Sequence, residues 1–381
     1  MAGLYIHIPF CESKCIYCDF YPLPLKNVTN RHQYVKKYLS ALSREIAIYA
    51  RDESIPKKLN SIYFGGGTPS ILEVSDIEKI LESIHFNFEV SKESEITLEA
   101  NPGTLDIEKL KILRSLGINR LSLGVQSFYD EDLKFLSRIH TAYDVFQIVK
   151  DTNDANFNNI SFDLIFSLPE QTIEKWKSNL QKAVEIHPTH ISCYSLIIEP
   201  ETPLFTMVHY KGVSVLSEEN DAELYEFTIE FLNNNGYRQY EVSNFAKSGF
   251  ESVHNKNYWN HIPYIGLGQS SHSFFNTKRW WNFRNIDRYI ESLNNNILPI
   301  ESEEVLTKQQ MINEFIYLGL RSEGINLNKL KESYCTDLLP IKKNLIENFV
   351  NGNLMICDGS YLKLTPTGYV MCDEICAELA L

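Results

Sequence analysis

The chain has 381 residues, of which 44% are hydrophobic and 22% are charged, and its formal net charge is −13. This composition is typical of an ordinary globular protein, and the length allows one domain of ~250 residues beside a smaller one. The negative charge argues against a broad electrostatic hold on nucleic acid or on an anionic membrane surface, but it allows a local basic pocket for a carboxylated ligand.

Three of the eight cysteines lie close together near the N-terminus. We therefore expect a reducing, cytoplasmic location rather than a disulfide framework. The apolar run Leu4–Ile8 predicts a buried strand close to the first residue, so no signal peptide fits. No apolar run is long enough to span a bilayer.

The cysteines follow this strand directly. Cys11, Cys15 and Cys18 have the spacing C-x3-C-x2-C. Three thiolates can hold three irons of a 4Fe–4S cube and leave the fourth iron with an open coordination position, where chemistry takes place. The alternatives are a zinc site or three unrelated buried thiols. Zinc usually takes a fourth Cys or His at short spacing, and nothing nearby supplies one cleanly, so the spacing favours the cluster.

Strands and helices alternate between Leu4 and Leu196. The expected strands are Leu4–Ile8, Ser61–Phe64, Glu95–Ala100, Arg120–Val125, Ile160–Phe166 and His190–Leu196. The expected helices are Arg31–Arg51, Ser75–Ile84, Asp106–Leu116, one that begins near Ala142, and Ile173–Glu185. Repeated right-handed βα units produce a parallel sheet with helices outside, and six units are too few for a closed eight-unit barrel. The pattern predicts an α/β fold with a partial (β/α)6 barrel.

The remaining chain changes character. After a helix at Glu218–Leu232, the sequence becomes rich in aromatic residues, which suits a flat apolar ligand and equally suits sheet packing. From about Leu306, three helices and two strands predict a winged-helix-like module; they are Lys308–Leu320, Asn326–Tyr334, Leu338–Asn351, Leu354–Cys357 and Tyr361–Leu364. Such modules often bind DNA, but the acidic chain favours packing or protein contact. We expect three domains, at 1–215, 216–305 and 306–381.

Candidate site residues gather at the carboxyl ends of the predicted strands, the edge at which such sheets bind ligands. The segment Gly65–Pro69 reads Gly-Gly-Gly-Thr-Pro, and its glycines let the backbone approach a ligand. Glu99 and Gln126 end later strands, although Glu99 alone could be a solvated carboxylate. Asp163 lies within an apolar strand, so we expect it to be hydrogen-bonded or bound to a ligand. Arg138 is a candidate partner for a carboxylate, or a surface charge.

Together these motifs resemble those of the radical S-adenosylmethionine superfamily. They are the cysteine triplet, Gly65–Pro69, Glu99-Ala100-Asn101-Pro102-Gly103, Gly124-Val125-Gln126-Ser127-Phe128 and Asp163-Leu164-Ile165. The resemblance implies that Cys11, Cys15 and Cys18 bind a 4Fe–4S cluster whose open iron takes the amino and carboxylate groups of S-adenosylmethionine. It also implies a cofactor pocket formed by Tyr5, Tyr17, Gly66, Gly67, Thr68, Glu99, Gln126, Arg138 and Asp163.

Within the superfamily, the sequence is similar to the branch that contains oxygen-independent coproporphyrinogen III dehydrogenase and the HemW-type heme chaperones. The dehydrogenase has a further cysteine where this chain has Phe20, and a substantial extension before the cysteine motif, which begins here at residue 11. The stretch His254-Asn255-Lys256-Asn257-Tyr258-Trp259 resembles the H-N-x-x-Y-W motif of the chaperones. All three features favour the chaperone.

That resemblance implies binding of heme and its delivery to acceptors such as respiratory proteins, without a nucleic-acid partner and without decarboxylation of coproporphyrinogen. The dehydrogenase is the enzyme alternative, and a purely structural cluster is a third interpretation. His254 is the first candidate for the heme ligand, because neutral imidazole is a good iron ligand, although a structural role fits it equally well. His272 is a weaker candidate. Catalytic residues, a cluster-dependent homodimer and a peripheral contact with membrane-bound acceptors stay open.

Overall fold

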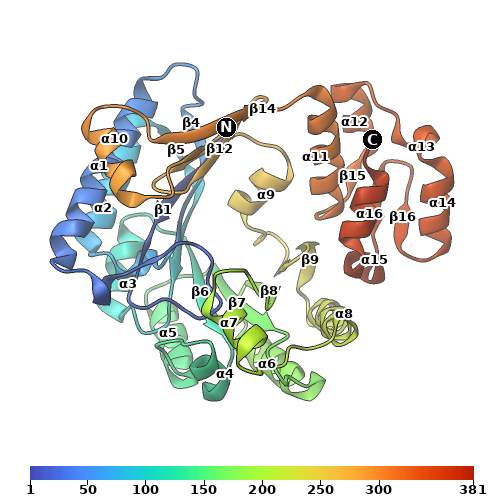
Figure 1. The fold of residues 1–381 in the computed structure, drawn as a ribbon, viewed down its shortest axis with the longest axis horizontal. Coiled ribbons are helices and arrows are strands. Elements are labelled where there is room, and N and C mark those ends of the chain that lie inside the picture. Colours follow the sequence, from blue (N-terminus) through green and yellow to red (C-terminus); the bar gives the residue numbers. More distant parts are fainter.

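The main feature of the computed structural model, which describes residues 1–381, is one large sheet (Figure 1). Its twelve strands have the order β14-β13-β12-β11-β1-β4-β5-β6-β7-β8-β10-β9. Six neighbouring strands run parallel, and they are β1 (Ala2–Ile8), β4 (Lys58–Gly66), β5 (Glu89–Ala100), β6 (Arg120–Gln126), β7 (Ile160–Phe166) and β8 (His190–Ser195). They confirm the α/β fold and the six predicted strands.

Helices join these strands and lie along the outer side of the sheet (Figure 1). They are α1 (Arg31–Arg51), α2 (Val74–Asn87), α3 (Ile107–Ser115), α4 (Asp130–Phe135), α5 (Ala142–Asp154) and α6 (Ile173–Glu185). The side chains of Asp106, Thr141 and Thr172 each accept a hydrogen bond from the backbone amide three residues later, which begins α3, α5 and α6. The main core packs 56 buried residues between these layers.

The sheet is wider than the sequence predicted. The strand β11 (Tyr264–Leu267) lies parallel to β1 on its outer side. It is followed by antiparallel β12 (His272–Phe275), β13 (Lys278–Asn282) and β14 (Ile300–Val305), while antiparallel β10 (Asn244–Ala246) and β9 (Arg238–Glu241) extend the other edge. These strands are short, and β14 is almost fully exposed, so they lack the apolar pattern that identifies a strand. The connecting helices are α7 (Pro203–Tyr210), α8 (Glu218–Asn234), α9 (Val253–Trp259) and α10 (Ile286–Asn294).

The C-terminal residues form a second, smaller unit, at the right of Figure 1. Its elements are α11 (Lys308–Leu320), β15 (Ile325–Asn326), α12 (Leu327–Tyr334), α13 (Leu338–Ile341), α14 (Lys343–Asn351), β16 (Met355–Cys357), β17 (Tyr361–Leu364), α15 (Pro366–Val370) and α16 (Cys372–Leu379). A core of 15 buried residues and a three-stranded sheet hold it together. One expected helix, Leu338–Asn351, is in fact two helices separated at Lys342. The predicted domain boundaries at 215 and 305 stay a prediction.

None of the helices combines the length and the apolar character that crossing a membrane requires.

Candidate functional site

The cysteine loop begins where β1 ends. The short strand β2 (Phe10–Cys11) pairs in parallel with β3 (Leu23–Pro24), which closes the base of the loop. Cys11, Cys15 and Cys18 are all partly exposed and carry free thiols. No three His, Cys, Asp or Glu side chains converge closely enough to hold a single metal ion. A 4Fe–4S cube takes one thiolate for each of three irons, so its cysteines surround the cluster and need not meet at one point.

A chain of polar groups links two of the thiols. Thr68 Oγ1 donates to Cys11 Sγ at 3.4 Å and accepts a hydrogen bond from Asn101 Nδ2 at 3.1 Å. The Arg138 guanidinium donates to the side-chain oxygen of Asn101, and its Nη1 lies 3.6 Å from Cys15 Sγ. The charge of this guanidinium lowers the pKa of Cys11 and so favours its thiolate, which is the form that binds iron. Asn101 was not among the predicted site residues, although its place at a strand end, before a proline, was a usable signal.

Burial raises the pKa of two thiols in the free chain, those of Cys11 and Cys18. Desolvation raises the pKa of Cys11 to about 11, and the hydrogen bond from Thr68 offsets only part of that rise. Desolvation also raises the pKa of Cys18. Because metal coordination deprotonates a thiol outright, assembly of a cluster at this loop releases protons.

Two glycines let the end of β4 fit against the cysteine loop. Gly66 has a φ of +109°, and a Cβ there would lie 2.6 Å from the His7 ring. A Cβ at Gly67 would lie 2.6 Å from the carbonyl oxygen of Phe10, while the Gly67 amide donates to the Ile8 carbonyl at 2.8 Å. The space beside these glycines is therefore filled by the chain itself. Their direct contact with a ligand stays a prediction.

Two carboxylates lie at the same end of the sheet. Glu99 accepts hydrogen bonds from the Tyr63 hydroxyl at 2.8 Å and the Gly66 amide at 3.2 Å. Asp163 accepts from Ser122 Oγ at 3.1 Å, so it is hydrogen-bonded, as the cost of burying a charge required. Burial raises the pKa of both carboxyls, to about 7 for Glu99, where the charge of Asp163 adds to the effect.

The other predicted cofactor residues are distributed around this rim. Gln126 has a φ of +64° beside an irregularity in the β6–β7 pairing, a feature common next to functional sites. The Tyr5 hydroxyl lies 3.1 Å from His7 Nδ1, whereas the buried Nε2 of His7 has no hydrogen-bond partner. Tyr17, between two of the cysteines, packs on a small apolar cluster of Leu136, Ile165 and Leu168.

The histidine predicted to hold heme is enclosed by the protein. His254, at the start of α9, is 1% exposed. Its Nδ1 lies 2.9 Å from Ser61 Oγ and its Nε2 lies 2.8 Å from the Tyr258 hydroxyl. Burial lowers the pKa of His254 to about 3, so the ring is neutral. Iron ligation would require one of these two contacts to break, and the role stays a prediction. His272 is exposed and stacks on Trp281.

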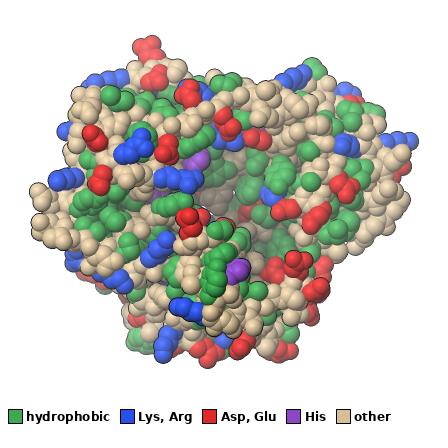
Figure 2. All heavy atoms as spheres, viewed as in Figure 1, with side chains coloured by type: hydrophobic (Ala, Val, Ile, Leu, Met, Phe, Trp, Pro, Cys, Tyr) green, Lys and Arg blue, Asp and Glu red, His purple; other side chains and the backbone are tan.

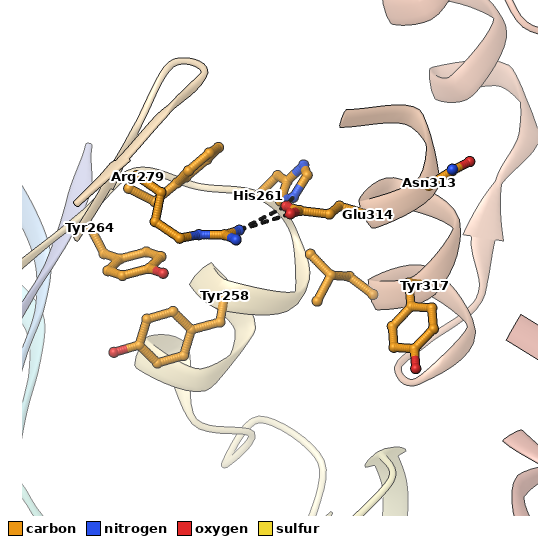
Figure 3. A pocket seen from close by; sticks show the side chains of 9 residues that line it. Tyr258, His261, Tyr264, Arg279, Asn313, Glu314 and Tyr317 are labelled. Atoms are coloured by element: carbon orange, nitrogen blue, oxygen red, sulfur yellow. Dashed lines mark hydrogen bonds and ion pairs between the residues drawn. The ribbon is translucent and has the colours of Figure 1, made fainter. Parts of the chain in front are cut away.

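A separate pocket lies where the sheet meets the C-terminal unit (Figure 3). It has a volume of about 420 Å³ and aromatic walls formed by Tyr258, Tyr264, Phe274 and Tyr317. Arg279 of β13 donates through Nη2 to both carboxylate oxygens of Glu314 on α11, at 3.0 and 2.8 Å, and His261 Nε2 lies 3.1 Å from the same carboxylate. This cluster had no local signal in the sequence, because Arg279, Glu314 and His261 come from separate segments.

The comparisons with known proteins agree with this geometry. A sequence profile of the radical SAM superfamily matches residues 5–183, and the profile of the HemN C-terminal domain matches residues 306–371. The heme chaperone HemW of Bacillus subtilis is 34% identical over 98% of each chain. The Escherichia coli protein of the same name is 37% identical over 71% of this chain and 69% of its own.

A solved structure shares the fold. The coproporphyrinogen III oxidase HemN of Escherichia coli, described as a radical SAM enzyme, superimposes with a TM-score of 0.85 at 22% identity, over 100% of this chain and 90% of its own. At that identity the likeness concerns the fold alone. Membership of the superfamily implies a 4Fe–4S cluster and S-adenosylmethionine, and the partly exposed thiols, the guanidinium beside them and the unpartnered His7 nitrogen fit both groups. With close relatives along its whole length, this chain belongs to the HemW family of the radical SAM superfamily.

Proposed function

We propose that this protein is a heme chaperone, which binds heme and delivers it to acceptor proteins. It carries a 4Fe–4S cluster and S-adenosylmethionine at the edge of the sheet that holds Cys11, Cys15, Cys18 and the residues around them, which we call the cysteine rim. The observation that carries the proposal is the 34% identity over 98% of the chain to a protein named as a heme chaperone. Phe20, two residues after Cys18, supports it, since the dehydrogenase pattern has a fourth cysteine at that position. Acceptors are respiratory heme proteins.

The residues of the rim divide the work of holding the cofactors. Cys11, Cys15 and Cys18 each hold one iron, while Arg138 and Thr68 orient two of the thiols. A 4Fe–4S cluster with an open iron supplies a ligand-binding position and a one-electron redox centre when bound. The pocket for S-adenosylmethionine is formed by Tyr5, Tyr17, Gly66, Gly67, Thr68, Glu99, Gln126, Arg138 and Asp163.

The protonation of Glu99 depends strongly on its surroundings in this pocket. Its carboxyl is held by Tyr63 and Gly66, and burial raises its pKa to about 7. An N–H donor placed against this carboxylate favours its charged form, because a hydrogen bond to the carboxylate offsets desolvation, and an amine bound to iron keeps N–H groups that can donate. Glu99 therefore suits the amino group of S-adenosylmethionine.

The experiment that tests the function measures heme binding and decarboxylation of coproporphyrinogen III side by side. Protein reconstituted with its cluster under anaerobic conditions is given coproporphyrinogen III, a reductant and S-adenosylmethionine, and in parallel is given heme. We expect stoichiometric heme binding and no decarboxylation. Formation of protoporphyrinogen would establish the dehydrogenase instead. The same preparation, sized with and without the cluster, tests a cluster-dependent homodimer.

The axial ligand needs its own test, because His254 has both ring nitrogens engaged. If His254 binds the iron, a His254→Ala variant loses heme binding although its fold is retained. Retention of full heme binding and transfer by a folded His254→Ala protein would limit His254 to its contacts with Ser61 and Tyr258.

A further inference from the structure

A second pocket lies on the other face of α11. Glu314 and Tyr317 of this helix line the pocket of Figure 3, and Phe315 and Gly319 of the same helix line the second one. Three- and four-residue spacing on each set is that of one helix face. The second pocket has a volume of about 490 Å³, within the range of small-molecule sites. We call it the lysine pocket and define it by Lys256, Trp259, Phe315, Lys329, Tyr361 and Lys363.

The lysine pocket carries positive charge that the protein does not neutralise. Lys256 Nζ pairs with Glu323 at 3.1 Å, the one carboxylate of the lining. Lys329 and Lys363 form no ion pair. Instead, their ammonium groups lie 5.5 and 4.9 Å from the ring centres of Phe315 and Tyr361. Such cation–π contacts hold the two ammonium groups beside aromatic walls and leave their charges available to an anion.

The local backbone fixes one of these lysines. Gly324 has a φ of +109°, and a Cβ there would lie 2.5 Å from Lys363 Cγ and 2.8 Å from the Leu362 carbonyl oxygen. Only a residue without a side chain lets β17 lie this close, so the Lys363 stem runs across Gly324 at the edge of the pocket. On the opposite side, Trp259 ends α9 and brings the aromatic motif of the sheet domain to the same pocket.

The pocket of Figure 3 is a weaker site for an anion. Its Arg279 is already paired with two carboxylates, Glu314 at 2.8 Å and Glu304 at 3.2 Å. A carboxylated ligand would have to displace or face these groups. Figure 2 shows the molecular surface hollowed between the sheet and the C-terminal unit, with hydrophobic side chains on its walls. Of the two pockets, only the lysine pocket combines aromatic walls with cations that form no ion pair.

We propose that the lysine pocket binds the tetrapyrrole ring of heme, with Lys329 and Lys363 pairing with its two propionates. The inference rests on the proposed function. Two unpaired ammonium groups match two carboxylates in number and sign, and Trp259, Phe315 and Tyr361 offer aromatic surface to the ring. The lining contains no His, Cys or Met. Heme held here would not be ligated by His254, so recognition depends on the ring and its carboxylates, and iron-free porphyrin should bind as well.

The test compares three ligands with the full-length protein: heme, protoporphyrin IX without iron, and the dimethyl ester of protoporphyrin IX. Binding is followed by the absorbance of the porphyrin. We expect the first two to bind with similar affinity and the ester to bind more weakly. The Lys329→Gln/Lys363→Gln variant weakens binding of both acids by about tenfold, the sum of two partly exposed charge pairs. The matched Lys308→Gln/Lys343→Gln variant removes two charges from the same unit outside the pocket and leaves affinity unchanged.

Each outcome separates the inference from the function on which it rests. If heme binds but iron-free porphyrin does not, or if the Lys329→Gln/Lys363→Gln variant binds heme as the wild type does, the lysine pocket is not the heme site and the chaperone function stands. If the wild type binds no tetrapyrrole, both fail. If it binds a single-stranded oligonucleotide in place of porphyrin, and the same double variant loses that binding, the pocket serves nucleic acid. Circular dichroism confirms that each variant is folded.

Discussion

The cysteine rim and the lysine pocket are built in opposite ways. At the rim, short motifs at consecutive strand ends supply the functional groups, and these groups already hold one another, as Arg138, Asn101 and Thr68 do beside the thiols. In the lysine pocket, the residues come from α9, α11, α12 and β17, and Lys329 and Lys363 form no ion pair. Groups that already hold one another suit a site that keeps its cluster in a fixed position. Ammonium groups without an ion pair suit a site that binds an anionic ligand and releases it.

The largest expected effect is the loss of iron from the cysteine rim, with porphyrin binding at the lysine pocket retained. Cys15→Ala removes one of three iron ligands, so iron content after anaerobic reconstitution should fall to the background. Protoporphyrin IX binding should be retained, because the lysine pocket shares no residue with the rim. The exposed Cys357 of β16 offers a control, since Cys357→Ala should keep its iron. Loss of porphyrin binding in folded Cys15→Ala protein would show that the two sites depend on each other.

A smaller effect tests whether the cysteine loop packs closely against the end of β4 because Gly67 has no side chain. Gly67→Ala places a Cβ 2.6 Å from the backbone of Phe10, next to Cys11, and should cost about 2 kcal/mol in the free energy of unfolding together with much of the bound iron. Gly359→Ala is the comparison, because Gly359 has a φ of +85° but no atom within 4 Å of the added Cβ. It should cost about 1 kcal/mol and no iron. Equal iron contents in the two variants would contradict the fit.

The pH dependence of stability tests the rim's buried carboxyl. The pKa of Glu99 is about 7 in the folded chain, above the ordinary value near 4.5, because of burial. Between these pH values the folded state binds more protons than the unfolded state, so the free energy of unfolding falls as pH rises through that window.

In the cluster-free protein, Glu99→Gln removes this loss. Its Tm relative to the wild type should therefore rise between pH 5 and pH 8, by on the order of 2 °C. Glu78→Gln, on the exposed surface of α2, controls for the loss of one negative charge. A Tm difference that stays constant across this range would show that Glu99 does not titrate there.

The smallest effect concerns the contact that joins the two units. Arg279→Lys replaces a guanidinium that meets both oxygens of Glu314 with a single ammonium, and should cost about 1 kcal/mol, less at high salt. Lys278→Gln, which removes an exposed pair with Glu303, should cost less. Urea denaturation of both variants measures the difference. An Arg279→Lys protein as stable as the wild type would mean that the bidentate contact with Glu314 does not stabilise the packing of the C-terminal unit on the sheet.

The sequence predicted much of the cysteine rim and none of the lysine pocket. The six parallel strands were found because each is a short segment with several apolar residues between helical segments, and most of the rim residues were found because they lie at or near the ends of those strands. Asn101 and Tyr63 were missed since their roles depend on Arg138 and Glu99, which approach them only in the fold. The lysine pocket had no local signal, because Lys256 and Lys363 are far apart in the chain. His254 was identified by its motif, but its enclosure by Ser61 and Tyr258 required the structure.

The most direct test of the account is a titration of the anaerobically reconstituted protein with heme, followed by addition of a heme-free acceptor protein. We expect one heme bound per chain and its transfer to the acceptor, with the porphyrin unchanged. A protein that binds no heme and converts coproporphyrinogen III to protoporphyrinogen would contradict it.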